Sequence, residues 1–329
     1  MIPMVSGPHD DITDVPGVLV GHASDVQAMT GVTVILPPET GAVGGAYIGG
    51  NASSTRQFDS LNPLHIVDRI HAVCFSGGSA YGLDAAGGVM RALEELGIGI
   101  PVVNRRIPIV PSAVIFDLSF GDGSVRPDQE MGRLAVRLAR QGPIDQGTVG
   151  AGTGATVGKL FGIERGMKGG AGSASAVFGD LVVGALVVVN AYGDVWDPDG
   201  RIMAGAREAP DSFRPADAAY LLATGRAVSR SVSAENTTLA VVAANARLSK
   251  ITASWIASQA TLGLGEVIRP VHSHIDGDVT VVIGVGEVEA DPNRVGLIAA
   301  ELLKRSVIKA VKAADGFGML PAWRDRESP

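Results

Sequence analysis

The chain has 329 residues, a formal net charge of −7 at pH 7 and a hydrophobic fraction of 46%. This length and apolar content are enough to bury a large core. No group of lysines and arginines is dense enough to follow a phosphate backbone, so nucleic acid is not the expected partner. The 44 glycines interrupt apolar runs, so they predict tight turns rather than disorder.

Three features concern the cellular compartment. The single cysteine, Cys74, excludes an intramolecular disulfide and is typical of a reducing cytoplasm. Residues 1–7 lack the basic and apolar regions of a secretory signal. The apolar run 181–190 has about half the length of a membrane-spanning helix, so we read it as a buried strand. We therefore expect a cytoplasmic protein with no membrane partner.

The first part of the chain predicts strands that alternate with helices. In the second expected helix, apolar residues recur at the i, i+3, i+4, i+7 spacing of one helical face. The expected strands are 18–20, 31–36, 41–48, 71–75 and 112–117, and the expected helices are 83–96 and 128–140.

The middle of the chain is less regular. Glycine and small residues dominate 147–175, which predicts either a flexible loop or a tightly built site wall. The run 177–189 is typical of a buried hairpin that turns at Gly179 and Asp180. A turn is expected at 198–200. From there to Glu235 the sequence predicts an exposed connector with a short helix at 215–224.

After Asn236 the pattern is β-α-β-α. Strands are expected at 238–245 and 278–285, a helix capped by Ser249 at 249–262, and a long helix at 293–313. Strands gathered in sheets, with helices on their outer faces, predict a layered α/β sandwich. Thr237 would then stand at the leading end of a core strand.

The Asn236-Thr237 junction can be interpreted in two ways. A chain cut before Thr237 would have a self-contained nucleophile, because its own α-amine, with an ordinary pKa near 8, can take the hydroxyl proton. The other interpretation is an ordinary loop-to-strand junction, which the polar residues 229–235 and the apolar run 239–243 explain equally. Taken alone, these residues favour the ordinary junction.

A second group of residues lies just before the expected strand at 278. If 271–275 is extended, His272 and His274 share a face, and with the carboxylates behind them they could ligate a metal. Alternatively, Asp276 and Asp278 form an acidic turn that orients a catalytic group. Spacing alone favours a plain Asp-Gly-Asp turn.

Two glycine-rich segments resemble nucleotide or nucleophile motifs only in part. In 150–159, Thr153 replaces the first glycine of a phosphate loop and Leu160 follows Lys159, while Val157 breaks the dinucleotide fingerprint. Lys159 is then either a surface lysine or a site lysine whose pKa burial lowers. In 77–82, Tyr81 replaces the second glycine of a nucleophile elbow. A structural turn there is favoured over catalysis by Cys74, Ser76 or Ser79.

Taken in order, these landmarks resemble the DmpA-like family of self-processing aminopeptidases and amidases, which includes the nylon oligomer hydrolases. The residues that carry the resemblance are 77–83, 112–117, 158–159, 189–190, 236–238 and 276–278. The resemblance implies a layered αββα sandwich of the N-terminal-nucleophile hydrolase type. It also implies one domain that cuts itself between Asn236 and Thr237 into an α fragment, 1–236, and a β fragment, 237–329.

The resemblance assigns roles to particular residues. It implies that Thr237 is the nucleophile, Asn190 a side-chain donor to the oxyanion, and Lys159 a cation near the nucleophile. It implies that Asp276 and Asp278 form the acidic pair that fixes Thr237 and its amine.

The threonine nucleophile and the two aspartates resemble the 6-aminohexanoate (nylon) oligomer hydrolase subgroup most. Phe116 stands where that subgroup has a tyrosine, so a phenolic hydroxyl is missing there. We expect Phe116 and Tyr81 to take part in substrate binding. The implied substrate is a short peptide or an ω-amino acid oligomer. No cofactor or metal is expected, and the implied assembly is a homo-oligomer of αβ units, such as a tetramer.

Two other functions stay open. An acyl-Thr237 ester released by an amine would make the protein an acyltransferase, and the ornithine acetyltransferases resemble this family in cutting before threonine. From a different class, His272, His274 and Asp276 would form the centre of a metal-binding regulatory protein.

Overall fold

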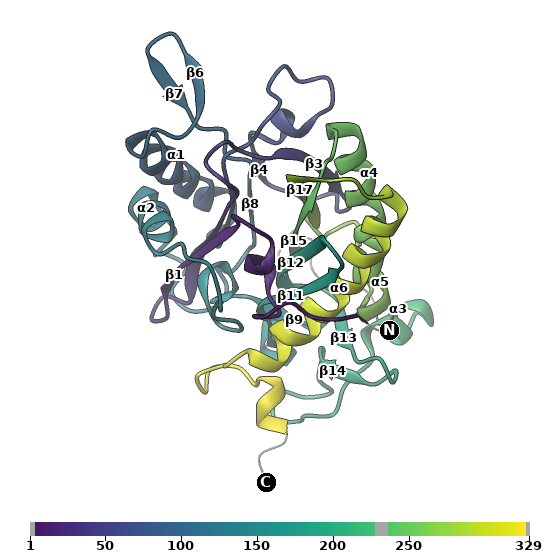
Figure 1. Cartoon of the computed structure of the whole chain (residues 1–329). Helices are drawn as coiled ribbons and strands as arrows, with labels where there is room; N and C mark the ends of the chain where they lie inside the picture. Colours follow the sequence, from purple (N-terminus) through teal and green to yellow (C-terminus); the bar gives the residue numbers. More distant parts are fainter. Residues whose placement is uncertain (1–3, 228–235, 327–329) are drawn as a thin grey trace.

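Two five-stranded sheets lie face to face between two layers of helices (Figure 1). The structure, a computed structural model, describes residues 4–227 and 236–326. The polar stretch 229–235 before the junction lies outside the described residues. No helix within the described residues is long and apolar enough to cross a membrane.

The first sheet is built from the N-terminal third of the chain. Its neighbouring strands are antiparallel except for one parallel pair, β5 with β8. Two helices, α1 (Ala85–Glu95) and α2 (Gln129–Arg137), cover its outer face. In spatial order the strands are β1 (Leu19–Asp25), β2 (Thr30–Leu36), β5 (Val73–Ser76), β8 (Ser112–Val114) and β4 (Thr55–Arg56).

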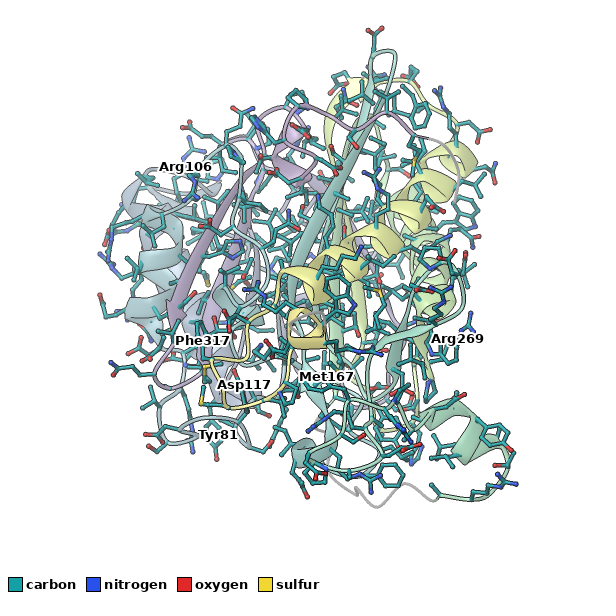
Figure 2. The ribbon with its side chains drawn as sticks, turned by 90° about the horizontal axis from the view of Figure 1, so that it is seen from below. Tyr81, Arg106, Asp117, Met167, Arg269 and Phe317 are labelled. Atoms are coloured by element: carbon teal, nitrogen blue, oxygen red, sulfur yellow. The ribbon has the colours of Figure 1, made fainter. Side chains whose placement is uncertain are left out.

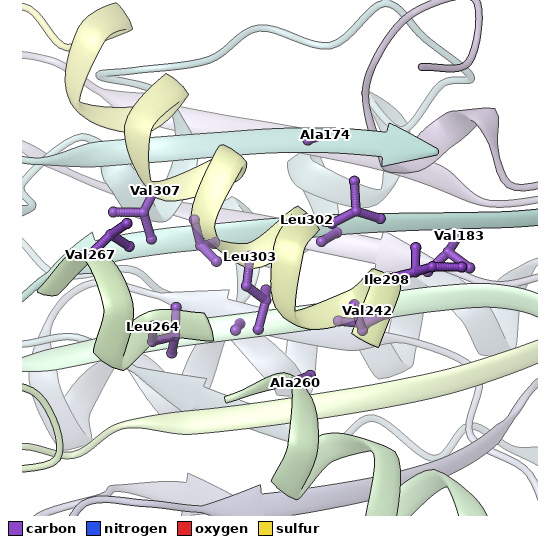
Figure 3. Close-up of a cluster of buried hydrophobic side chains, with 14 of the residues drawn as sticks. Ala174, Val183, Val242, Ala260, Leu264, Val267, Ile298, Leu302, Leu303 and Val307 are labelled. Atoms are coloured by element: carbon purple, nitrogen blue, oxygen red, sulfur yellow. The ribbon is translucent and has the colours of Figure 1, made fainter. Parts of the chain in front are cut away.

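The second sheet contains the junction strand β15. It is antiparallel except for the β15·β17 pair, and α4 (Lys250–Ala260) and α6 (Pro292–Ala313) cover its outer face. Figure 3 shows α6 side chains packed on this sheet. In spatial order the strands are β11 (Gly170–Phe178), β12 (Leu181–Asn190), β15 (Thr237–Ala246), β17 (Val279–Val288) and β3 (Val43–Ile48).

Smaller elements complete the chain. A hairpin projects from the first layer, and a short two-stranded ladder and a three-stranded sheet lie near the end of the second sheet (Figure 1). They are β6 (Ile100–Val102) with β7 (Arg105–Ile107), β9 (Thr156–Val157) with β10 (Met167–Lys168), β14 (Ile202–Ala204) with β13 (Asp194–Trp196) and β16 (Ile268–Arg269), and the helices α3 (Ala218–Ala223) and α5 (Leu262–Val267).

The apolar runs read as buried strands owe their composition to burial on both faces. One face of β12 and β15 packs against helices, while the other, with Leu186, Val188, Leu239 and Val241, packs against the first sheet. A strand covered on both sides reads as continuous Val, Leu and Ala rather than as an alternating pattern. The run 181–190 is therefore a core strand, as predicted.

Most predicted elements are confirmed, and two differ. The strand expected over 112–117 ends at Val114, because Val114 pairs with Ser76, the last residue of the neighbouring strand β5. Beyond that point Phe116 O accepts from the Asn190 side chain. The prediction of an exposed connector is wrong for residues 203–207, which are buried. There the Arg207 guanidinium donates to the carbonyl oxygens of Glu164 and Gly166.

Candidate active site

Strand register brings the predicted site residues to one end of the second sheet. Asn190, the last residue of β12, pairs directly with Thr237, the first residue of β15. Because β17 runs parallel to β15, the residues before it reach the same end, and Asn236 bridges to Asp276. Lys159 follows β9 and binds Asn190.

The Thr237 hydroxyl lies beside the peptide bond that precedes it. Its Oγ1 donates a hydrogen bond of 2.5 Å to the carbonyl oxygen of Asn236. The same oxygen accepts the Gly277 N–H at 2.8 Å. Thr237 is 5% exposed, so this carbonyl is polarised by two donors in a site that excludes most water.

Gly277 is a site residue that the sequence reasoning missed. A Cβ at this position would lie 2.8 Å from Thr237 Oγ1 and 2.9 Å from Ala52 O, so a side chain would push the hydroxyl away. Its functional atom is a backbone N–H, which any residue type carries. The one signal in the sequence is the glycine between Asp276 and Asp278, and that pattern is equally typical of a turn.

Asp278 is held by three donors. Its Oδ1 accepts from the Thr238 N–H at 2.5 Å, and its Oδ2 accepts from the N–H and the Nδ1 of His272 at 3.0 and 2.8 Å. His272 Nε2 lies 3.0 Å from Thr261 Oγ1. These contacts fix the carboxylate next to the start of β15.

Asp276 has one oxygen held and one oxygen with no partner among the described residues. Its Oδ2 accepts from the N–H and hydroxyl of Ser273 at 2.9 and 2.6 Å, whereas its Oδ1 is buried and unpaired. Burial and the neighbouring Asp278 charge raise the pKa of Asp276 to about 6, against the opposing effects of Ser273 and Lys159. Asp276 thus holds a proton more readily than an ordinary aspartate.

Residues 271–275 are not extended, so His272 and His274 do not share a strand face. His272 has a positive φ of 53°, and the Asp276 N–H donates to Ser273 O at 3.0 Å, which closes a turn. His274 is exposed, whereas His272 binds Asp278. Within the described ranges, no three His, Cys, Asp or Glu side chains gather as metal ligands.

The Asn190 amide is oriented by its neighbours. Its Oδ1 accepts from Lys159 Nζ at 2.9 Å and from the Thr156 N–H at 3.0 Å, and its Nδ2 donates to Phe116 O at 3.0 Å. Lys159 Nζ also donates to Asn190 O at 3.1 Å. Lys159 is 7% exposed, so the surface-lysine alternative is wrong. The amide therefore presents N–H donors, not its oxygen, on the Nδ2 side.

The two expected substrate-binding aromatics differ in position. Phe116 is half-buried and contributes its carbonyl oxygen to Asn190. Tyr81 is 60% exposed, and the Arg126 guanidinium lies 3.8 Å from its ring centre. Figure 2 shows Tyr81 at the margin of the molecule.

The 74–82 segment is a structural turn, as favoured from the sequence. Burial raises the pKa of the Cys74 thiol to about 12, so it is not a thiolate nucleophile at neutral pH. Ser76 Oγ donates to Gly82 O. Gly78 has a φ of 79° and donates its N–H to Asp117.

Comparison with known proteins agrees with this architecture. The family model for peptidase family S58 matches residues 10–319. An uncharacterized aminopeptidase of Mycobacterium leprae is 37% identical over 97% of this chain and 95% of its own length. A 6-aminohexanoate-oligomer endohydrolase of Kocuria sp. is 31% identical over 91% of this chain and 85% of its own length.

The fold has a solved counterpart. The L-aminopeptidase D-Ala-esterase/amidase of Ochrobactrum anthropi, described as a variant of the N-terminal-nucleophile (Ntn) hydrolase fold, superimposes with a TM-score of 0.69 at 20% identity, over 96% of this chain and 89% of that chain. The predicted layered sandwich of that type is confirmed. The chain belongs to peptidase family S58.

Proposed function

We propose that the protein is a self-processed N-terminal-threonine hydrolase that cuts amide bonds in short peptides or ω-amino acid oligomers. Membership of peptidase family S58 makes it a peptide or amide hydrolase. The observation that carries the finer proposal is the Thr237 hydroxyl, 2.5 Å from the carbonyl oxygen of its own preceding peptide.

The first reaction is the cut at Asn236-Thr237. Thr237 Oγ1 attacks the Asn236 carbonyl carbon, and the Gly277 N–H donates to the oxygen on which negative charge develops. Asp276 takes the hydroxyl proton and returns it to the Thr237 nitrogen as the C–N bond breaks, so the nitrogen leaves as an amine and Asp276 is a carboxylate again. Water then hydrolyses the resulting ester. The hydroxyl and the carbonyl group belong to the same chain and are already in contact. This intramolecular placement supplies most of the rate gain over attack by a separate molecule.

The second reaction uses the new N-terminus on a substrate. The Thr237 amine takes the proton of its own hydroxyl, which attacks the substrate acyl carbon. The Asn190 N–H group donates to the acyl oxygen, and Lys159 adds positive charge beside it. Asp276 and Asp278 balance the Thr237 ammonium, which then returns the proton to the substrate nitrogen as the amide C–N bond breaks and the amine leaves. Water completes hydrolysis of the acyl-Thr237 ester.

The Kocuria relative acts, by its name, on 6-aminohexanoate oligomers. This supports testing that substrate class beside L-peptides. We expect purified protein to gain amidase activity in proportion to the fraction that has been cut. Activity and fragment content are measured along one incubation, with 6-aminohexanoate oligomers and short peptides as substrates. Full activity in a preparation that is still uncut would contradict the proposal.

Gly277→Ala should slow self-cleavage by at least about tenfold, because a 1 Å shift of a reacting group is enough to cost about 10²-fold in rate. The added Cβ would meet Thr237 Oγ1 at 2.8 Å. Gly265→Ala is the matched control, since its Cβ would meet only Val271 Cγ1 at an ordinary 3.5 Å. The cut fraction is followed by gel densitometry. Equal rates in both variants would show that Gly277 has no part in the cut.

Asp276→Asn should stop self-cleavage and stabilise the uncut chain above pH 6. The folded-state pKa, about 6, lies above the ordinary 3.8, so the folded state binds more protons between about pH 4 and 6 and stability falls as pH rises through that window. Asparagine removes this cost, which at pH 8 is about 1 to 3 kcal/mol.

The comparison is made in a Thr237→Val background, so that both chains stay uncut. Urea unfolding should show the chain with Asp276→Asn to be more stable at pH 8 and equally stable near pH 4. A stability difference that is the same at both pH values would contradict the ionisation assigned to Asp276.

A further inference from the structure

A buried lysine, Lys168, lies outside the site just described. Lys168 is 0% exposed, and its Nζ donates to three backbone carbonyl oxygens: Gly152 at 3.1 Å, Ala155 at 2.7 Å and Gly169 at 3.0 Å. Burial lowers the pKa of Lys168 to about 7, against the attraction of Asp117. An ammonium is costly to bury, so the buried position of Lys168 indicates that the residue has a specific role.

The carbonyls bound by Lys168 lead directly to Asn190. Lys168 pairs across the β9·β10 ladder with Thr156, and Ala155, one of its acceptors, immediately precedes Thr156. The Thr156 N–H and hydroxyl donate to Asn190 Oδ1 at 3.0 and 3.3 Å. The ammonium thus holds the backbone that holds the amide oxygen.

A buried carboxylate, Asp117, holds the backbone that contacts the Asn190 amide nitrogen. Asp117 is 3% exposed, and it accepts from the Gly78 N–H at 2.7 Å and from Thr30 Oγ1 at 2.7 Å. It follows Phe116, whose carbonyl oxygen accepts from Asn190 Nδ2 at 3.0 Å.

The two charged side chains contact one backbone segment. A Cβ on Gly154 would lie 2.8 Å from Asp117 Oδ2, so the segment 152–155 that Lys168 binds also contacts Asp117. The Lys168 charge favours the ionised form of Asp117, whose pKa burial raises. Figure 2 shows Asp117 and Met167, the neighbour of Lys168, in the same part of the molecule.

We propose that Lys168 and Asp117 are positioning residues that fix the Asn190 amide from its two ends, Lys168 through Thr156 and Asp117 through Phe116. This inference rests on the proposed function, in which the Asn190 N–H group donates to the developing oxyanion. An oxyanion donor works only when held in place before the reaction. Two buried opposite charges, each fixed by several hydrogen bonds, supply such rigidity.

Lys168→Met tests the first half. We expect kcat of the mature enzyme to fall by about 10- to 100-fold, while KM changes less than about threefold, because the donor acts mainly in the transition state. The control is Lys250→Met. Lys250 also donates to three carbonyl oxygens, those of Ser60, His65 and Val67, but it lies on α4, away from Asn190.

Thermal unfolding and kinetics are measured on both variants well below their melting temperatures. A Lys168→Met enzyme that is folded and has the wild-type kcat would overturn the proposal. So would an equal fall of kcat in Lys250→Met, because loss of any lysine that binds three carbonyl oxygens would then explain the result.

Asp117→Asn tests the second half of the proposal. It also provides the test of the whole proposal if the Lys168→Met variant does not fold. Asp11→Asn is the control, because Asp11 is a 1% exposed carboxylate that holds backbone through the Thr13 and Ile144 N–H groups, at 2.8 and 3.1 Å. We expect kcat to fall about tenfold or more in Asp117→Asn alone. Equal kcat values in the two variants would overturn the proposal.

Asn190→Ala separates this inference from the proposed function. If Asn190→Ala lowers kcat while Lys168→Met and Asp117→Asn keep it at the wild-type value, only the positioning proposal fails. If Asn190→Ala itself keeps the wild-type kcat, the proposed function fails in its oxyanion step, and the positioning proposal falls with it.

Discussion

Thr237→Val should leave the chain uncut and lower kcat/KM for amide substrates by at least about 10⁴-fold, because both reactions lose their nucleophile. Valine keeps the β-branched shape that suits the start of β15, so the fold should persist. The cut is followed by denaturing gel and the activity by amine release from a short peptide.

The neighbouring threonine offers a matched control. Thr238 is 0% exposed, its Oγ1 has no partner among the described residues, and its contact with Asp278 uses the backbone N–H. Thr238→Val should therefore be cut and active. Cleavage of the Thr237→Val chain between residues 236 and 237 would show that the nucleophile is a different group.

Asn190→Ala should lower kcat by about 10²- to 10³-fold with a smaller effect on KM, the usual result of removing one oxyanion donor. The substitution also frees Lys159 Nζ and the Thr156 N–H from a shared acceptor. Initial rates on one amide substrate give both constants.

Asn245→Ala controls for the loss of a strand-end amide. Asn245 lies near the far end of β15, where its Oδ1 accepts from the Val182 N–H and its Nδ2 donates to Asp180 O. We expect its kcat to stay within about twofold of wild type, because no reacting group depends on it. If Asn190→Ala matched Asn245→Ala in kcat, Asn190 would have no role in the reaction.

Local patterns predicted most of the second half of the fold. The four elements expected after Asn236 are present in the expected order, with the unpredicted α5 and β16 between α4 and β17, and Ser249 caps α4 by accepting from the Thr252 N–H. Helix α6 begins with Pro292, whose fixed φ suits a helix start. These elements follow from periodicity and capping, which act within one segment.

The pairing of distant segments needed the structure. The segment 147–175, read as either a loop or a wall, is buried from 150 to 160 and forms β9, β10 and the start of β11. The Lys168 ammonium fixes this segment, because it binds carbonyl oxygens that are far from it in sequence. No local pattern shows which carbonyl oxygens a lysine will reach.

The five residues assigned by resemblance do lie together at one sheet end. Their hydrogen-bond partners, however, could not be predicted from the sequence. Gly277 acts through its backbone, and the His272 side chain binds Asp278 because a positive φ turns the chain at that point. Such contacts depend on backbone conformation rather than on residue type. The two-fragment organisation, the homo-oligomer and the cytoplasmic location stay predictions.

The most direct test is the intact mass of purified protein under denaturing conditions, together with the N-terminal sequence of any smaller chain. We predict two chains, residues 1–236 and 237–329, whose masses sum to the 33.7 kDa of the full chain plus one water, the smaller one beginning Thr-Thr-Leu. A single 33.7 kDa chain that stays intact on prolonged incubation, yet hydrolyses amides at full rate, would contradict self-processing before Thr237.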